Sequence, residues 1–333
     1  MSSASRRRGL TQARSGGSAA SSPACWAAFR LATTMRILFA GARDWASVAH
    51  RMARALNTSD DVTARVYVQH AHPFGYQEDL IGPDDVSAAR AFGATADWFV
   101  STGDGNYGAY DALQVELDAG NARQATMHVG SAYRRRPHEY NLLDRARCFE
   151  RRLVSADSYR FCLEDATAFP IPPVALTDAP LAPLRGPPRT SHSPSSRRTK
   201  GTACVLEALR GVDVDIIEKV TYAECLQRRA QSRIFVAQLN PAVGGFGQSS
   251  VEALSQGCAT LVDVRHVHPK VWTHYARPPL IDVRTAAQLR NEVLRLRAHQ
   301  EQLEAQQRLS LEWARTFGAP VVAGSYLRDV FRT

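Results

Sequence analysis

Short apolar runs alternate with amphipathic stretches from residue 35 onward. Residues 36–41 form an apolar run that ends in glycine, which is typical of a buried parallel strand. In the stretch 47–57, Val48, Met52 and Leu56 are four residues apart and therefore share one face of a helix. The same alternation predicts a helix at 110–119 and strands at 62–69, 97–102 and 124–129. Alternating strands and helices indicate a parallel sheet that helices cover on both faces.

The composition changes in the middle of the chain, after which the alternation resumes. Residues 177–196 are rich in proline, serine, threonine and arginine, and we interpret 177–191 as a linker. The linker separates a predicted N-terminal Rossmann-like domain, 35–176, from a second one, 192–331. In the second domain we expect strands at 212–219, 233–239 and 258–264, helices at 202–211, 222–231 and 249–256, and terminal helices at 285–307, 309–317 and 321–331. Such folds bind ligands at the carboxyl ends of their strands, here in the cleft between the domains.

The composition is that of a folded protein with a modest excess of positive charge. The chain has 333 residues, of which 44% are hydrophobic and 22% charged, enough for one large domain or two ordinary ones. Its net charge is +9, but residues 1–34 contain five arginines and no acidic residue. The +4 that remains is too small to predict a nucleic-acid partner. We interpret residues 1–34 as a disordered extension; a transit peptide, the alternative, has a similar composition.

Cysteine usage and hydropathy bear on where the protein is found. Six cysteines are scattered without a CxxC pair, which argues against zinc ribbons and favours reduced thiols. The most apolar early segment, 24–41, is interrupted by Arg30 and Arg36 and is too short to span a membrane. We therefore expect a cytoplasmic protein with at most peripheral contact with a membrane.

Three motifs resemble ligand sites but have simpler explanations. The segment Gly103–Gly108 matches GxGxxG, yet it follows a later strand instead of the first, so we interpret it as a loop. Asp213 and Asp215 resemble a metal-binding DxD pair, but they alternate with apolar residues as solvent-facing strand positions do. His266 and His268 have no further ligands near them in the sequence. We therefore expect no bound metal ion.

A basic cluster marks the beginning of the second domain. Arg197, Arg198 and Lys200 lie in a loop that leads into a helix at Gly201. The first N–H groups of a helix are unpaired and carry partial positive charge, so nearby cations complete a phosphate site. A basic, solvated linker end is the alternative explanation of these residues. Lys200 favours the phosphate site, because it is one of only three lysines in a chain that otherwise uses arginine.

A glycine-rich turn follows the predicted strand 233–239. Residues 240–257 run from this turn into a helix that carries Glu252 in its first turns. Glycines let a ligand approach the backbone closely, and the helix start again favours an anion. Glu252 is a carboxylate that can accept the two hydroxyl groups of a ribose. In purely structural terms the segment is an ordinary turn, and Glu252 is a surface acid.

These segments resemble the family-four retaining glycosyltransferases of the GT-B fold (glycosyl transferases group 1). The family has a Lys-Gly pair after the first strand of its second domain, as in Lys200-Gly201, and a Gly-Phe-Gly turn before Glu-Ala, as in 245–247 and 252–253. Residues 127–131 with Arg134 are similar to its His-x-Gly-Ser…Arg segment. The resemblance covers about residues 35–331. It implies an α/β fold of two Rossmann-like parallel-sheet domains that face each other across a cleft, with closing C-terminal helices.

The resemblance also implies an activity and a set of site residues. The activity is transfer of a hexose or similar sugar, with retention and without a metal ion, from a nucleotide diphosphate sugar to a glycan, lipid or small-molecule acceptor. No cofactor is implied besides this donor substrate. Lys200 would contact the diphosphate and Glu252 the ribose. The implied catalytic residues are His128, Arg197 and Lys200; those on the acceptor side are Gly41, Ser131 and Arg134; those that bind the donor are Gly201, Val220, Gly245, Phe246, Gly247, Gln248, Ser249 and Glu252.

Two positions depart from the family pattern. The family has a second glutamate eight residues before the one in the helix, where this chain has Gly244. It also has an arginine five residues before the lysine, where this chain has Ser195. Asn240 is the candidate to replace the glutamate, and Arg197 or Arg198 the arginine. Because the missing glutamate usually contacts the sugar, the alternative function is a non-catalytic GT-B-like protein that binds a nucleotide or glycan in a polysaccharide pathway.

Overall fold

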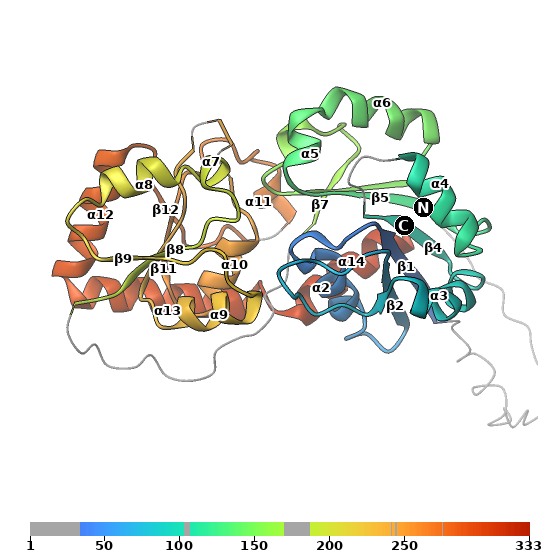
Figure 1. Cartoon of the computed structure of the whole chain (residues 1–333), viewed down its shortest axis with the longest axis horizontal. Coiled ribbons are helices and arrows are strands. Elements are labelled where there is room, and N and C mark those ends of the chain that lie inside the picture. The colour runs from blue at the N-terminus through green and yellow to red at the C-terminus, as the bar shows by residue number, and fades with distance from the viewer. Residues whose placement is uncertain (1–33, 103–106, 170–186, 241, 244, 275) are drawn as a thin grey trace, which may run out of the picture. The chain divides into compact units, whose positions relative to one another are not determined.

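The computed structural model describes residues 34–102, 107–169, 187–240, 242–243, 245–274 and 276–333 (Figure 1). Within these residues the chain forms two parallel sheets with helices packed on them. The described residues belong to one structural unit, 34–333. The predicted extension, apart from Thr34, and most of the predicted linker lie outside the described residues.

The first sheet has the strand order β3-β2-β1-β4-β5-β6-β7, and all its paired strands are parallel. Its strands are β1 (Met35–Gly41), β2 (Val62–Val68), β3 (Leu80–Ile81), β4 (Trp98–Ser101), β5 (Arg123–His128), β6 (Arg151–Ser155) and β7 (Thr167–Phe169). The strands predicted at 36–41, 62–69, 97–102 and 124–129 are confirmed. The pattern of apolar residues does not reveal β6 or β7, because β6 begins with two arginines and β7 is only three residues long.

The side chains of β1 alternate between two buried clusters. Ile37 and Phe39 share one cluster with residues of α2 (Val48–Leu56) and α14 (Pro320–Arg332). Leu38 and Ala40 share the other with Phe92 of α3 (Val86–Gly93). The strand is therefore covered on both faces, which explains its continuous apolar run. The other helical segments of this part are η2 (Trp45–Ser47), η3 (Pro83–Asp85), α4 (Tyr107–Glu116), α5 (Gly130–Arg135), α6 (Pro137–Arg147) and η4 (Tyr159–Phe161).

The last helix, α14, packs on the first sheet and lies beside α2 (Figure 1). Leu327 and Phe331 belong to the same buried cluster as β1, and the Trp98 indole N–H donates to the Phe331 carbonyl at 3.0 Å. A Cβ at Gly324 would overlap a carbonyl oxygen of α2, so glycine lets the two helices touch. Residues 321–331, which the sequence led us to assign to the second domain, therefore cover the first sheet.

The second sheet has the order β12-β11-β10-β8-β9 and is also parallel. Its strands are β8 (Thr190–His192), β9 (Val214–Ile216), β10 (Ile234–Gln238), β11 (Ala259–Val262) and β12 (Ile281–Asp282). The strands predicted at 233–239 and 258–264 are confirmed, and the one at 212–219 is shorter than predicted. Ile234 and Val236 of β10 and Ala259 and Leu261 of β11 pack in one buried cluster with residues of α8 (Thr202–Ala208) and α12 (Ala286–Ala298).

Strand β8 lies between β9 and β10 although its sequence, Thr-Ser-His, is polar. All three residues are buried. The ring of His192 contacts the Val236 carbonyl through Nδ1 at 2.7 Å and the Thr202 hydroxyl through Nε2 at 2.9 Å. These hydrogen bonds offset the cost of burying a polar ring. The second sheet thus begins at Thr190, inside the predicted linker and two residues before the predicted domain boundary.

The helices of the second part mostly follow the predicted pattern, except near the C-terminus. The predicted helix 285–307 is divided at His299, whose backbone is not helical, and the predicted helix 309–317 is the second half of α13. Neither glycine nor proline marks this break in the sequence. None of the described helices is both long and apolar enough to cross a membrane. The helices are α7 (Arg197–Lys200), α8 (Thr202–Ala208), α9 (Tyr222–Ala230), α10 (Gln248–Ser255), α11 (Val271–His274), α12 (Ala286–Ala298) and α13 (Gln300–Thr316).

Candidate functional site

A cavity of about 250 Å³ lies where loops from both sheets meet. The loops that line it follow β1, β2, β5 and β6 of the first sheet and β8, β9 and β10 of the second. This is the edge at which parallel α/β sheets bind ligands, because the carboxyl ends of the strands and the N-termini of the helices meet there. Among the lining residues are 45–46, 129–130, 155 and 157 from the first sheet and 193–195, 217–220 and 247–249 from the second.

Lys200 reaches the cavity from the last residue of the short helix α7. Gly201 follows it with φ of +68°, and a Cβ there would overlap the carbonyl oxygen of Leu239. This packing fixes where the chain turns, so that Lys200 Nζ lies 3.5 Å from the hydroxyl of Ser249 in the first turn of α10. Burial lowers the pKa of the Lys200 ammonium to about 8. The sequence led us to expect Lys200 in a loop, beside the start of the helix that follows Gly201; in the structure Lys200 ends α7, and its ammonium lies beside the start of α10 instead.

The glycine-rich turn places the start of α10 at the cavity. The Gln238 amide donates to the Gly245 carbonyl at 2.7 Å, and the Gly245 N–H donates to the Asp263 carbonyl at 2.8 Å. Phe246 is buried against Trp272 and Trp313 and anchors the turn. Gly247, Gln248 and Ser249 line the cavity, whereas Gly245 and Phe246 support them from behind. The positive end of α10 thus faces the cavity.

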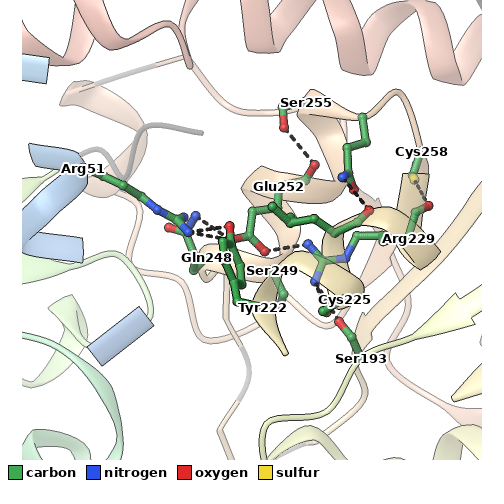
Figure 2. Close-up of polar contacts among 12 residues, drawn as sticks. Arg51, Ser193, Tyr222, Cys225, Arg229, Gln248, Ser249, Glu252, Ser255 and Cys258 are labelled. Carbon is green, nitrogen blue, oxygen red and sulfur yellow. Dashed lines mark hydrogen bonds and ion pairs between the residues drawn. The ribbon is translucent and has the colours of Figure 1, made fainter. Parts of the chain in front are cut away.

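Glu252 lies one turn further along α10 and is the centre of a buried polar cluster (Figure 2). Its Oε1 accepts from Arg51 at 2.9 Å, Tyr222 at 2.7 Å and Gln248 at 3.1 Å. Its Oε2 accepts from Arg229 at 2.5 Å. Burial acts to raise the pKa of Glu252, but the two guanidinium groups and the hydroxyl together hold it below its usual value. The carboxylate is therefore ionised and engaged on both oxygens.

This cluster changes the interpretation of Glu252. The residue lines the cavity, but it is only 4% exposed, so it is not the surface acid of the alternative reading. Any ligand hydroxyl that reaches Oε1 must displace one of its present donors. Arg51 comes from α2 on the first sheet, and its guanidinium also lies over the ring of Tyr222, which begins α9. Nothing in the sequence indicates this long-range contact, 201 residues apart.

His128, predicted as catalytic, does not line the cavity. Its side chain is buried below the end of β5, where Nε2 lies 2.7 Å from Asp144 Oδ2 and the ring stacks on Tyr133. The residues that follow it, Val129 and Gly130, line the cavity instead. The side chain of a strand residue faces one side of the sheet, and here that side is the packed interior. The sequence cannot distinguish the two directions.

Arg197, Gly41 and Gly201, which were also predicted as site residues, lie outside the cavity lining. Arg197 forms an ion pair with Glu218 through two bonds of 2.9 and 2.5 Å, and its side chain is exposed. Gly41 ends β1 where a Cβ would overlap the Thr102 side chain, so its role is close packing. By contrast, Val220 lines the cavity as predicted. Ser131 lies in α5, and nothing is described of its side chain.

Arg134 and Asp157 form an ion pair at the cavity wall. Arg134 Nη1 donates to Asp157 Oδ2, and the Ser155 hydroxyl donates to Oδ1 at 2.7 Å. Asp157 also lies against the glycine turn, since a Cβ at Gly245 would come within 2.7 Å of the Asp157 Cβ. We predicted Arg134 but missed Asp157, because the strand before it does not stand out in the sequence.

The departures and minor motifs have different outcomes. Gly244 lies outside the described residues, as do 103–106 of the GxGxxG segment. Asn240 donates to the carbonyls of Arg198 and Thr199 at 3.0 Å each, so it braces α7. Asp215 pairs with Arg228. Within the described ranges, no three His, Cys, Asp or Glu side chains gather as a metal site.

Comparison with known proteins identifies the fold. No family model matches the chain, and no curated protein matches it in sequence. Among solved structures, HepE of Anabaena in complex with UDP-glucose has a TM-score of 0.64 and 11% identity, over 90% of this chain and 99% of that chain. Sucrose-phosphate synthase from Thermosynechococcus elongatus has a TM-score of 0.60 and 12% identity, over 90% of this chain and 98% of that chain. A glycosyltransferase from Rickettsia africae has a TM-score of 0.57 and 10% identity, over 90% of this chain and 98% of that chain.

These similar structures are glycosyltransferases of the GT-B type. The two Rossmann-like parallel sheets of this chain therefore have the GT-B fold, as the sequence predicted. Sequence identities of 10–12% establish the fold and leave the chemistry to be argued from the cavity itself.

Proposed function

We propose that the protein is a glycosyltransferase that moves a hexose or similar sugar from a nucleoside diphosphate sugar to a hydroxyl acceptor, with retention and without a metal ion. One observation carries the proposal: Lys200 and the start of α10 meet in a cavity at the carboxyl ends of both sheets. A cation beside a helix N-terminus is a site for phosphate oxygens. The similar structures of Anabaena HepE in complex with UDP and with UDP-glucose support the same choice.

The second sheet supplies the groups that would hold the nucleotide. The diphosphate lies against Lys200 and the first turn of α10, and the base lies along residues 218–220, which line the same cavity. The ribose reaches Glu252 once Arg51 and Tyr222 release its Oε1. The present cavity of about 250 Å³ is smaller than the roughly 300–1,000 Å³ of common small-molecule sites. Donor binding therefore requires some of the side chains that line the cavity, such as Arg51-bound Tyr222 and Glu252, to move.

The first sheet supplies the groups that would hold the sugar. Arg134 and Asp157 present a guanidinium and a carboxylate to the cavity beside the glycine turn. Both groups bind hydroxyls well, because charged hydrogen bonds are stronger than neutral ones. Asp157 would thus contact the sugar in place of the glutamate that the family has at the position of Gly244.

The chemical step is a group transfer at the anomeric carbon. The bond from this carbon to the diphosphate oxygen breaks, and the nucleoside diphosphate leaves with the electron pair. A bond forms from the same carbon to the acceptor oxygen, and the acceptor proton passes to the departing diphosphate. Retention places the acceptor on the face from which the diphosphate leaves. Lys200 and the α10 N-terminus stabilise the charge that develops on that diphosphate, a role that a metal ion fills in other enzymes.

A second candidate is a non-catalytic protein that binds a nucleotide or glycan. The observation that favours it is the engagement of both Glu252 oxygens by Arg51, Tyr222, Gln248 and Arg229. Turnover separates the two candidates. The full chain is incubated with UDP-glucose, GDP-mannose or ADP-glucose and no acceptor, and free nucleoside diphosphate is measured. An enzyme slowly transfers the sugar of one of these donors to water and releases its nucleoside diphosphate. A binding protein binds a nucleotide but releases no nucleoside diphosphate from the donor.

A further inference from the structure

Three aromatic side chains form one wall of the cavity, on the side of the first sheet. They are Trp45, Phe74 and Tyr76, and all three line the cavity. They surround the buried ring of His72, whose centroid lies 4.9, 5.1 and 4.6 Å from their rings, respectively. Their planes are inclined to the His72 ring by 85°, 56° and 57°, so none of the three stacks flat on it. We call these three residues the aromatic wall.

Two of the three residues of the aromatic wall are exposed, whereas Tyr76 is half-buried. Trp45 is 41% exposed and Phe74 is 38% exposed, whereas Trp98 and Phe99 of the same sheet are buried. Burying such rings is favourable at ~25 cal/mol per Å² of apolar area. Leaving two of them accessible in a cavity forgoes that gain, and a ligand that covers them recovers it.

The backbone that carries Trp45 is held in a strained conformation. The next two residues, Ala46 and Ser47, have φ of 60° and 55°, in the left-handed region that non-glycine residues rarely adopt. The carboxylate of Asp44 fixes this turn by accepting from the N–H groups of Ala49 at 2.9 Å and His50 at 2.8 Å. Local strain of this kind is retained where it positions a functional group. Here it directs the Trp45 indole into the cavity.

The polarity of the same wall limits what it can bind. Ala46, Val48 and Val129 complete the lining around the aromatic wall. Among the described lining residues of the first sheet, Arg134, Ser155 and Asp157 bind one another, and the aromatic wall itself carries the hydroxyl of Tyr76, whose ring centroid lies 4.6 Å from that of Tyr222. A sugar that sat on the aromatic wall would bury several hydroxyls with few partners, and each unpaired one is costly. A flat apolar ring meets no such cost.

We propose that the aromatic wall is the acceptor subsite and that the acceptor is a phenol or a similar aromatic alcohol. This rests on the proposed function, because the acceptor oxygen replaces the diphosphate oxygen at the anomeric carbon and its proton passes to the departing diphosphate. The ring of the acceptor packs between Trp45 and Phe74. Its hydroxyl then faces the region of Arg134 and Asp157, where the donor sugar lies.

The test measures binding of 4-methylumbelliferone to the full chain by calorimetry, with and without saturating UDP. The variants are Trp45→Ala, Phe74→Ala and the conservative Trp45→Phe. The matched control is Phe317→Ala, because Phe317 is 39% exposed and lies outside the cavity lining. We expect each alanine variant of the wall to weaken binding about tenfold, since an aromatic pair adds to the gain from buried area. Trp45→Phe restores most of the affinity, and Phe317→Ala leaves it unchanged.

Several results would overturn the proposal. One is that methyl α-D-glucopyranoside binds in a Trp45-dependent way and 4-methylumbelliferone does not bind. Another is equal affinity for 4-methylumbelliferone in all variants. A third is loss of UDP affinity in Trp45→Ala, which would assign the wall to the nucleotide base. Failure of the proposed function gives a different pattern, because then UDP does not bind and no sugar is transferred, while Trp45-dependent binding of 4-methylumbelliferone persists.

Discussion

Arg51 Nη2 lies 2.9 Å from Glu252 Oε1, so a side chain of α2 on the first sheet pairs with one of α10 on the second. Both side chains are buried, and Arg229 neutralises the same carboxylate from the other side. Two guanidinium groups thus share one carboxylate. The contact fills the position that a ribose would take in the proposed complex, which makes Arg51 a competitor of the donor.

Replacing Arg51 tests this competition. In Arg51→Met the carboxylate keeps Arg229 and Tyr222, so we expect a loss of about 1–3 kcal/mol in stability, less than for breaking an isolated buried pair. Glu252 Oε1 then accepts ribose hydroxyls more readily, and the preference for UDP over 2′-deoxy-UDP rises. Calorimetric titration with both nucleotides measures this preference. Arg54→Met is the control, since Arg54 lies on the same helix and is exposed; an unchanged preference in Arg51→Met contradicts the account.

Replacing Asp157 tests the sugar side of the cavity. Asp157→Asn keeps the shape but loses the charge that faces Arg134. We expect kcat/KM for release of UDP from UDP-glucose to fall about 10- to 100-fold, the value of a charged hydrogen bond, with UDP affinity almost unchanged. Asp165→Asn is the matched control for Asp157→Asn, because Asp165 also pairs with an arginine, Arg152, but at an exposed site outside the cavity lining. Equal losses of UDP and UDP-glucose binding would show that Asp157 acts only through the fold.

Two glycines allow the cost of backbone strain to be measured separately from the cost of steric overlap. Gly201 and Gly211 both have positive φ, but only at Gly201 would a Cβ overlap another group, the Leu239 carbonyl. We expect Gly211→Ala to lose about 1–2 kcal/mol, the cost of the left-handed conformation, and Gly201→Ala to lose more than this. Gly201→Ala also displaces Lys200 and weakens UDP binding. Urea unfolding and UDP titration check both statements, and equal stability losses for the two variants would refute the role of the overlap.

His192 gives the protein a defined pH dependence. Burial lowers the pKa of His192 to about 4 in the folded state, below its ordinary value of 6.5. Between these values the unfolded chain binds the proton and the folded chain does not, so stability falls as the pH drops from about 6.5 to about 4. The total is about 3 kcal/mol, from 1.36 kcal/mol for each unit.

The measurement compares urea unfolding of the wild type and His192→Gln at pH 7 and pH 5. We expect the wild type to lose about 2 kcal/mol more than the variant over this interval. The comparison between the two proteins is necessary because burial raises the pKa of Asp44 to about 6, which acts in the opposite direction. Asp44 is present in both proteins, so its effect cancels. Parallel pH profiles would show that His192 titrates normally.

The sequence predicts those features that depend on local pattern. Apolar runs reveal β1 and β10, because strands that are buried on both faces must be apolar throughout. Lys200, Gly201 and the start of α10 are recognisable because their chemistry depends on neighbours in the chain. Strand β8 escapes detection because its residues are polar, although the ring of His192 is hydrogen-bonded to groups as distant as the Val236 carbonyl.

Other features depend on the direction of a side chain or on distant partners. His128 faces Asp144 in the interior, and Arg197 faces Glu218 at the surface, so neither reaches the cavity. Arg51 reaches Glu252 only because the fold brings together two side chains that are 201 residues apart in the chain. Trp45 is directed by two strained residues that no periodicity marks. These contacts are set by tertiary structure, which a single sequence does not encode in any local pattern.

The central claim is that Lys200 and the start of α10 bind a diphosphate, and one titration tests it most directly. The wild type is titrated with UDP, GDP and ADP, and the tightest of them is then compared with its nucleoside in Lys200→Ala and in the control Lys270→Ala, whose lysine lies outside the cavity lining. We predict that Lys200→Ala weakens the diphosphate about 10- to 100-fold, as expected for one charged contact, and leaves the nucleoside unchanged. Equal losses for both ligands, or no binding of any diphosphate to the wild type, would contradict the claim.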